Sequence, residues 1–363
     1  MGLRLESVDK IVGVEAHLTG IRLDFETGSR NVLLGRTLAG KTSLLRIMAG
    51  LGRPTHGRVF MDGKDVTGVS VRKRNVAMVY QQFINYPSLT VYGNIASPLR
   101  MAGMNRRDID ERVRQVAGIL HLEPFLHRLP AELSGGQQQR TAIARALVKE
   151  AELLLLDEPL VNLDYKLREE LREELTDIFK KGRSIVVYTT TEPSEALMLG
   201  GNVVVIDEGG VLQTGPAAEV YRNPRSTRVA EVFSDPPINY LDVLVEEGRA
   251  RLGESVAVPL EGHLRGLSPG KYRFGLRSNR FYLKPTGDRD VALEARVELP
   301  EINGSETFIH VDYGGARLVI HETGIHKYRI GSAITFFVNP LHFFVYSKSG
   351  RLVASPDLGL RRP

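Results

Sequence analysis

A glycine-rich loop between an apolar strand and a helix is the feature that most constrains how this chain folds. The run Gly35-Arg36-Thr37-Leu38-Ala39-Gly40-Lys41-Thr42 follows the apolar residues 32–34 and precedes a helical pattern over residues 43–49. In such a loop the backbone N–H groups and the helix N-terminus cradle phosphates, a lysine reaches the terminal phosphates, and the next hydroxyl binds Mg²⁺. An ordinary glycine-rich turn is the alternative interpretation. The predicted nucleotide-binding residues here are Gly35, Arg36, Thr37, Leu38, Ala39, Gly40, Lys41, Thr42 and Ser43.

An acidic pair closes a second apolar segment. Asp157 and Glu158 follow four consecutive leucines, residues 153–156, which read as a buried strand. An aspartate at that point can hold Mg²⁺, and an adjacent carboxylate can polarise the attacking water. A pair of acids that caps a helix after a core strand is the alternative. Beside a phosphate-binding loop, the pattern predicts Thr42 and Asp157 as metal ligands and Glu158 as a catalytic residue.

A third motif, Leu133-Ser134-Gly135-Gly136-Gln137, opens a helix that runs through residues 142–147. The serine is a good helix cap, glycines expose backbone donors, and a helix N-terminus favours an anion. Taken alone, Ser-Gly-Gly is a common turn. In this order and spacing, the three motifs predict a protein that handles ATP, with Ser134, Gly135, Gly136 and Gln137 among its binding residues.

Length and strand pattern predict two domains. The 363 residues exceed what one hydrophobic core usually holds. Strand candidates at 153–156 and 185–188, separated by a charged helix over 165–180, favour a mostly parallel sheet. After residue 235 the helical periodicity ends and short alternating segments follow, typical of an all-β barrel. We therefore expect an α/β core over residues 1–235, with a helical subdomain at about 88–150, and an all-β domain over 236–363.

Composition excludes several classes of function. The net charge of +5 is spread along the chain, with only short basic clusters, so a solvated surface is favoured over a nucleic-acid site. The absence of cysteine excludes disulfides, thiolate zinc sites and cysteine nucleophiles, and suits a reducing cytosol. No apolar run approaches the roughly 18 residues of a membrane-spanning helix. We expect any membrane role to come through a partner.

The helix after Ser134, with its Ala-Ile-Ala-Arg-Ala-Leu continuation, resembles the ATP-binding subunits of ABC transporters, and the segment 77–103 is most similar to the maltose-importer-like group. The resemblance implies a head-to-tail pair in which each ATP lies between one P-loop and the opposite Ser134–Gln137 segment. It also implies that Gln81 contacts Mg²⁺ and senses the permease, and that Asp164 lines the nucleotide interface. Segments 274–277 and 342–346 are similar to the group's regulatory oligonucleotide-binding-like domain, although Ser278-Asn279 replace Pro-Glu.

Five positions depart from the family pattern. Leu38 replaces the middle glycine of the loop and is a residue type that resists positive φ. Thr191 replaces the switch histidine that orients the γ-phosphate and water, and its hydroxyl is shorter and cannot carry positive charge. The full set is Val12 for an aromatic that stacks on adenine, Arg36 for proline, Leu38 for glycine, Val161 for serine and Thr191 for histidine. Neutral drift is one interpretation of Thr191, and a slow or incompetent ATP site is the other.

The P-loop sequence together with Tyr-Thr-Thr-Thr-Glu-Pro is similar to one subunit of glycerol-type importers, which pair two distinct ATPases. This implies an ATP- and Mg²⁺-dependent importer subunit for a small polyol or sugar-like solute. The implied partners are a second, distinct ATPase, the membrane permeases and, indirectly, a solute-binding protein, with no nucleic acid. The implied location is the cytoplasmic face of the inner membrane. A soluble ABC protein acting on DNA or ribosomes and a non-hydrolysing regulatory module are the alternatives.

Overall fold

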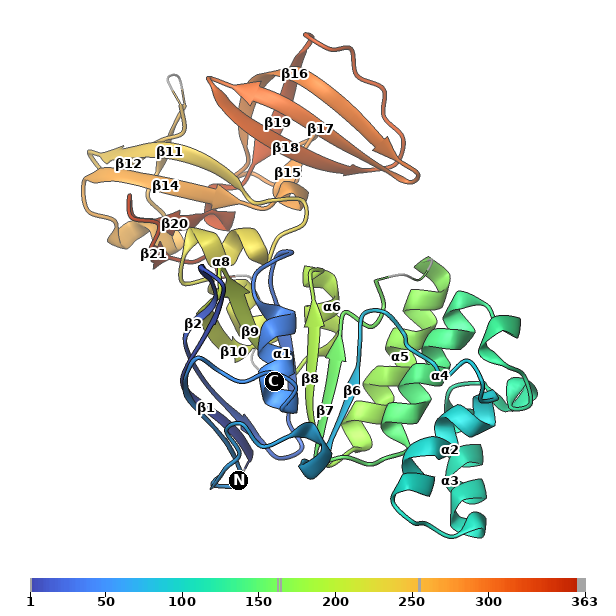
Figure 1. Cartoon of the computed structure of the whole chain (residues 1–363). Coiled ribbons are helices and arrows are strands. Elements are labelled where there is room, and N and C mark those ends of the chain that lie inside the picture. Colours follow the sequence, from blue (N-terminus) through green and yellow to red (C-terminus); the bar gives the residue numbers. More distant parts are fainter. Residues whose placement is uncertain (1, 162, 164, 254–255, 358–363) are drawn as a thin grey trace. The chain divides into compact units, whose positions relative to one another are not determined.

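The computed structural model describes residues 2–161, 163, 165–253 and 256–357, and divides by its contacts into two compact units, residues 1–217 and 218–363 (Figure 1). By this division, most of helix α7 and all of α8 count with the second unit. The domain boundary near residue 235 remains a prediction.

A six-stranded sheet forms the centre of the first unit, in the order β10-β9-β3-β8-β7-β6. Strands β9, β3, β8, β7 and β6 run parallel, and only β10 is antiparallel to its neighbour. The parallel strands are nearly continuous apolar runs because both faces of the sheet are covered. This confirms the predicted α/β sheet. The strands are β3 (Arg30–Leu34), β6 (Val76–Val79), β7 (Leu153–Asp157), β8 (Ile185–Thr190), β9 (Asn202–Asp207) and β10 (Gly210–Pro216).

A smaller antiparallel sheet, in the order β2-β1-β4-β5, packs on the same core. Helix α1 (Lys41–Ala49) buries Leu44, Leu45 and Met48 in the cluster that also holds Leu5 of β1 and Leu155 of β7. The helix therefore lies between the two sheets, with its N-terminus fixed at the end of β3 (Figure 1). The strands are β1 (Gly2–Val12), β2 (Glu15–Glu26), β4 (His56–Met61) and β5 (Lys64–Asp65).

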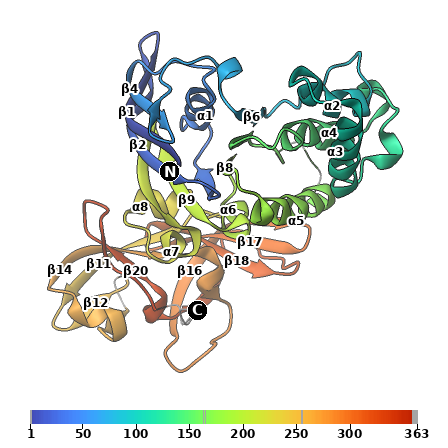
Figure 2. The same ribbon diagram turned by 90° about the horizontal axis from the view of Figure 1, so that it is seen from below.

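Helices fill the region predicted to be helical and lie to one side of β6, β7 and β8 in both Figure 1 and Figure 2. Thr90 and Asn105 cap α2 and α3, because their side chains accept the N–H groups of Gly93 and Asp108. The helices of the first unit, apart from α1, are α2 (Val91–Met101), α3 (Arg106–Ile119), α4 (Gly135–Leu147), α5 (Tyr165–Lys181) and α6 (Pro193–Leu199), with 3₁₀ turns at Val71–Lys73, Glu123–Phe125 and Pro130–Glu132. No helix among the described residues is long and apolar enough to cross a membrane.

The second unit begins with α7 and α8 and continues as two antiparallel sheets, in the orders β13-β12-β11-β14-β20-β21 and β15-β19-β16-β17-β18. Both sheets contribute to one apolar cluster, which includes Leu241, Phe274, Ile309 and Phe336. This fits the predicted small barrel-like domain. The elements are α7 (Ala217–Arg222), α8 (Thr227–Val232), β11 (Asn239–Glu246), β12 (Arg249–Arg251), β13 (Ala257–Pro259), β14 (Gly270–Leu276), β15 (Phe281–Tyr282), β16 (Val291–Asn303), β17 (Glu306–Tyr313), β18 (Ala316–Thr323), β19 (Ala333–Val338), β20 (Phe344–Tyr346) and β21 (Leu352–Ala354), with 3₁₀ turns at Gly262–Gly266, Ser278–Arg280 and Pro340–His342.

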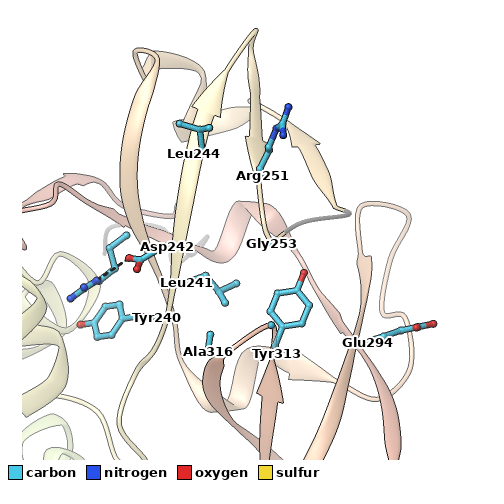
Figure 3. A pocket seen from close by; sticks show the side chains of 12 residues that line it. Tyr240, Leu241, Asp242, Leu244, Arg251, Gly253, Glu294, Tyr313 and Ala316 are labelled. Atoms are coloured by element: carbon cyan, nitrogen blue, oxygen red, sulfur yellow. Dashed lines mark hydrogen bonds and ion pairs between the residues drawn. The ribbon is translucent and has the colours of Figure 1, made fainter.

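An open cavity of about 760 Å³ lies within the second unit (Figure 3). Figure 3 shows Leu244 and Asp242 on β11, with Tyr313 from the other sheet across from them. Asp242 pairs with Arg273 at 3.5 Å, so the charges of these two lining residues compensate each other. The cavity therefore offers a mixed aromatic and ion-paired wall.

Replacing Phe336 by alanine tests the second core. The ring is fully buried, with its centroid 5.5 Å from that of Phe281 and 6.1 Å from that of Tyr313. We expect Phe336→Ala to lower the free energy of unfolding of this unit by about 3–5 kcal/mol. Urea unfolding followed by circular dichroism measures the loss. Phe308→Ala is the control: that ring is half-buried against His321, and its removal costs less. Equal losses in both variants contradict the described core.

Candidate functional site

The loop between β3 and α1 keeps a phosphate-binding shape although Leu38 replaces a glycine. The N–H of Gly35 donates to Thr190 O at 3.2 Å, and a Cβ built there would lie 2.4 Å from Ile206 O. Leu38 adopts φ 67° and leaves 96% of its surface exposed. The left-handed conformation costs a non-glycine residue about 1–2 kcal/mol. Its side chain points to solvent, so the strained residue leaves the backbone conformation of the loop unchanged.

The other residues of the loop anchor it to the first unit. Ala39 is buried, its N–H donates to Arg36 O at 3.1 Å, and its carbonyl accepts the N–H of Gly209 at 3.2 Å. Gly40 precedes α1 with φ 99°, where a side chain would be strained. Ser43 Oγ lies 3.2 Å from His17 Nδ1. Arg36 and Thr37 are exposed, as a loop that meets a ligand requires.

Lys41 is buried and fully engaged. Its Nζ donates to Gly35 O at 2.8 Å and to Arg36 O at 3.0 Å, and lies 3.0 Å from Glu158 Oε1. An ammonium group has three donors, and these three oxygens take all of them. Any phosphate that binds Lys41 must therefore displace a carbonyl or the Glu158 carboxylate.

Asp157 joins three elements through one carboxylate oxygen. Its Oδ1 accepts hydrogen bonds from Thr42 Oγ1 at 3.1 Å and from Thr189 Oγ1 at 3.0 Å. Burial raises the pKa of Asp157, and the hydrogen bonds from the two hydroxyls oppose that rise. The carboxyl end of β7 is thus tied to the start of α1 and to β8. Thr42 and Asp157, both predicted metal ligands, lie together.

Glu158 has a left-handed backbone, with φ 44°, and its carboxylate lies against Lys41 of the loop. Its N–H donates to Thr189 Oγ1 at 2.9 Å, and its side chain pairs with Lys41. Gln81 Nε2 donates to Glu158 Oε2 at 3.5 Å, so the predicted Gln81 lies at the edge of the same cluster. Sequence reasoning did not identify Thr189, because threonine is ordinary in a β-strand.

The Ser134 motif caps α4 as expected. Ser134 Oγ accepts the N–H of Gln137 at 3.3 Å, and Gln137 Oε1 accepts the N–H of Ser134 at 3.0 Å, a reciprocal capping box. A Cβ on Gly136 would lie 1.9 Å from Leu167 Cδ2, whereas one on Gly135 meets nothing within 4 Å. Gly136 serves the packing of this chain, and Gly135 faces open space. Figures 1 and 2 place α4 across β6–β8 from α1.

Thr191 follows β8 directly and is half-buried. No hydrogen bond of its side chain occurs within the described part of the chain. Its neighbour Thr190 accepts the N–H of Glu192 at 2.9 Å, and Glu192 forms an ion pair with Arg168. Of the other predicted positions, Val12 ends β1 half exposed and Val161 is exposed, while Asp164 lies outside the described residues.

A buried amide fixes the loop that follows Gln81. Asn94 of α2 donates to Tyr86 O at 3.0 Å and accepts the N–H of Tyr86 at 2.8 Å. Arg145 of α4 donates to Asn94 Oδ1 at 3.3 Å and stacks over the Tyr86 ring at 4.7 Å. Asn85 donates to Gln138 O at 2.8 Å, in the first turn of α4. The loop beside the cluster is thus attached to the helix that Ser134 caps.

Leu38→Gly tests the strain in the loop. Glycine occupies the left-handed region without the Cβ clash, whereas Leu38→Ala keeps that clash. We expect the glycine variant to unfold at higher urea, with a free energy of unfolding about 1 kcal/mol above that of the alanine variant. Urea unfolding of both variants gives this difference directly. Equal stabilities contradict a strained left-handed residue at position 38.

Comparison with known proteins agrees with this geometry. A family model described as ABC transporter matches residues 18–161. The chain is 36% identical over 363 residues to the trehalose/maltose import ATP-binding protein MalK of Thermococcus litoralis, covering 94% of this chain and 97% of the relative. It is 36% identical over 336 residues to the sn-glycerol-3-phosphate import ATP-binding protein UgpC of Salmonella typhi, covering 92% and 94%.

A solved structure gives the same assignment. The dimeric ABC transporter cassette MJ0796 matches with a TM-score of 0.55 and 28% identity, covering 59% of this chain and 98% of its own. The sequence relatives extend over more than nine-tenths of the chain, beyond the part that this structure covers. The chain therefore belongs to the ATP-binding subunits of ABC transporters, which bind and hydrolyse ATP.

Proposed function

We propose that this chain is an ATPase subunit of an importer for a small polyol or sugar-like solute, glycerol included, and that it works beside a second, distinct ATPase. Relatives named for trehalose/maltose and sn-glycerol-3-phosphate import support the solute class. The observation that carries the proposed asymmetry is Thr191 at the switch-histidine position, beside an intact Ser134 cap on α4.

The residues at the carboxyl end of β7 fit Mg²⁺. This ion prefers oxygen ligands and is usually held by one or two carboxylates together with substrate phosphates. Asp157 supplies a buried carboxylate, and Thr42 supplies a hydroxyl 3.1 Å away. Within the described residues there is no group of three or more His, Cys, Asp or Glu side chains that could hold a metal alone. We infer that Thr42 and Asp157, with Gln81 nearby, hold Mg²⁺ only with nucleotide, and that the ion neutralises phosphate charge.

ATP binding in this proposal exchanges the partners of Lys41. The phosphates take the Lys41 ammonium and the backbone N–H groups at the start of α1, an electrostatically favourable position for an anion. Glu158 is then released from its 3.0 Å ion pair and becomes available to accept a proton from water. Gln81, which donates to the Glu158 carboxylate, is placed to orient that group. The ion pair thus keeps the base occupied until a nucleotide displaces it.

Three features support a weak ATP site on this chain. Thr191 has a neutral hydroxyl where an imidazole is expected, so it supplies no positive charge toward the γ-phosphate. Val12 offers no aromatic face to a base. Leu38 adds a left-handed strain to the loop. An intact Ser134–Gln137 segment still suits the ATP of a partner in a head-to-tail pair, where we expect Asp164 to line the interface.

The remaining partners follow from the same proposal. The loop tied to α4 through Asn94 and Arg145 is where we expect a permease to act on Gln81. The permease would keep the chain at the cytoplasmic face of the inner membrane as a peripheral subunit, with a solute-binding protein involved only indirectly and no nucleic acid.

Thr191→His tests the proposed defect. We expect the purified chain to hydrolyse ATP slowly, and the histidine variant to turn over about 100-fold faster, the low end of the range for a single general acid–base group. Phosphate release under steady state measures both. Thr191→Val is the matched control and should stay at the low rate, because it exchanges the hydroxyl for a methyl group and supplies no imidazole. Rapid turnover by the unmodified chain, unchanged in Thr191→His, contradicts the proposal.

Two substitutions test whether the two ATP sites of the assembled transporter contribute unequally to solute uptake. Ser134→Arg removes the cap of α4 and adds bulk where the partner's γ-phosphate would lie, so we expect it to damage the more active site. Glu158→Gln neutralises the base of this chain's own, weaker site, so it should reduce uptake less. Solute uptake by vesicles carrying each variant is the measurement. Abolished uptake in Glu158→Gln with mild loss in Ser134→Arg would show that the two sites are not divided in this way.

A further inference from the structure

We propose that Thr189 is a positioning residue of the ATP site, whose single hydroxyl holds both acidic residues in place. This inference rests on the proposed use of Asp157 and Glu158 with ATP and Mg²⁺. It concerns a residue outside the three sequence motifs, at the end of β8.

The hydroxyl of Thr189 uses its donor and an acceptor on adjacent residues of β7. It donates to Asp157 Oδ1 at 3.0 Å, the nearer of two acceptors, since the carbonyl of Leu156 lies at 3.5 Å, and it accepts the N–H of Glu158 at 2.9 Å. A hydroxyl has one hydrogen and two lone pairs, so both bonds form at once. The side chain is fully buried, and solvent does not compete for either contact.

Packing alone does not explain a threonine here. The first three residues of β8, Ile185, Val186 and Val187, are buried and apolar. Valine has the same branched shape, suits a strand equally well, and would bury no hydroxyl. A buried hydroxyl is unfavourable unless it is hydrogen-bonded. The polar choice is therefore explained by the two bonds that it makes.

The first bond leaves one oxygen of Asp157 for a cation. Both hydroxyls that reach this carboxylate, those of Thr42 and Thr189, donate to Oδ1. Within the described residues Oδ2 accepts no hydrogen bond, and it is not among the buried atoms without a partner. Thr189 thus fixes the orientation of the carboxylate without occupying the oxygen that would meet a metal ion. Partners of this kind typically tune metal affinity by 10–100-fold.

The second bond holds the unusual backbone of Glu158. A left-handed glutamate persists only where its surroundings determine its conformation. The N–H of Glu158 is satisfied by Thr189, and its carboxylate is satisfied by Lys41. Loss of the hydroxyl leaves that N–H without its partner and loosens the direction of the Glu158 side chain. The Thr189 side chain therefore fixes the positions of both Asp157, the proposed metal ligand, and Glu158, the proposed base.

Equilibrium binding of radiolabelled ATP to the purified full chain tests this without relying on turnover. Binding is measured across a Mg²⁺ titration and again in excess EDTA. We expect Thr189→Val to raise the half-saturating Mg²⁺ concentration by about ten-fold or more, with ATP affinity in EDTA unchanged. Thr189→Ser keeps the hydroxyl and should restore the Mg²⁺ dependence of the unmodified chain.

Thr190→Val is the matched control. It is the same substitution one residue along β8, at another buried threonine, whose hydroxyl accepts the N–H of Glu192 rather than contacting Asp157 or Glu158. It should leave the Mg²⁺ titration unchanged. An unchanged titration in Thr189→Val, or an equal shift in Thr190→Val, overturns the role of Thr189. Failure of the unmodified chain to bind ATP at any Mg²⁺ concentration instead overturns the proposed function.

Discussion

The carboxylate of Asp157 is the point on which the geometry of the ATP site depends. Burial disfavours its charge, and the hydroxyls of Thr42 and Thr189 offset that effect by donating to one of its oxygens. Because these threonines come from α1 and β8, the same bonds align three elements of the first unit. Helix α1 and strands β7 and β8 therefore cannot shift independently without unpairing a buried acid.

A second constraint links the loop to the base. Lys41 satisfies its three donors with two loop carbonyls and Glu158, so the cation and the carboxylate neutralise each other in a region of low exposure. Separating such a pair is unfavourable unless another charge replaces one partner. Terminal phosphates supply negative charge to Lys41 and leave Glu158 unpaired. The Lys41–Glu158 ion pair stabilises the nucleotide-free chain. It also means that Glu158 becomes available as a base only when a nucleotide binds.

The fold was largely predictable for strands that are buried on both faces of the sheet. Apolar runs at β7 and β8 identified the parallel sheet, and the glycine-lysine loop located α1. Prediction failed where a residue type carries no distinctive pattern. At Leu38 the residue type disfavours a left-handed conformation, and yet the loop imposes one. Thr189 escaped notice because its role depends on a neighbouring strand.

The contacts around Asn94 explain how a surface loop is coupled to the motif at Ser134. The side chain of Asn94 bonds both the N–H and the carbonyl of Tyr86, as a backbone partner would. Arg145 of α4 donates to the same amide. Asn85 makes a further bond to the first turn of the same helix. Buried polar groups are costly to unpair, so a displacement of the loop that preserves these bonds must move α4 with it. These bonds therefore attach the loop after Gln81 to the helix that Ser134 caps, and we expect the two to move together.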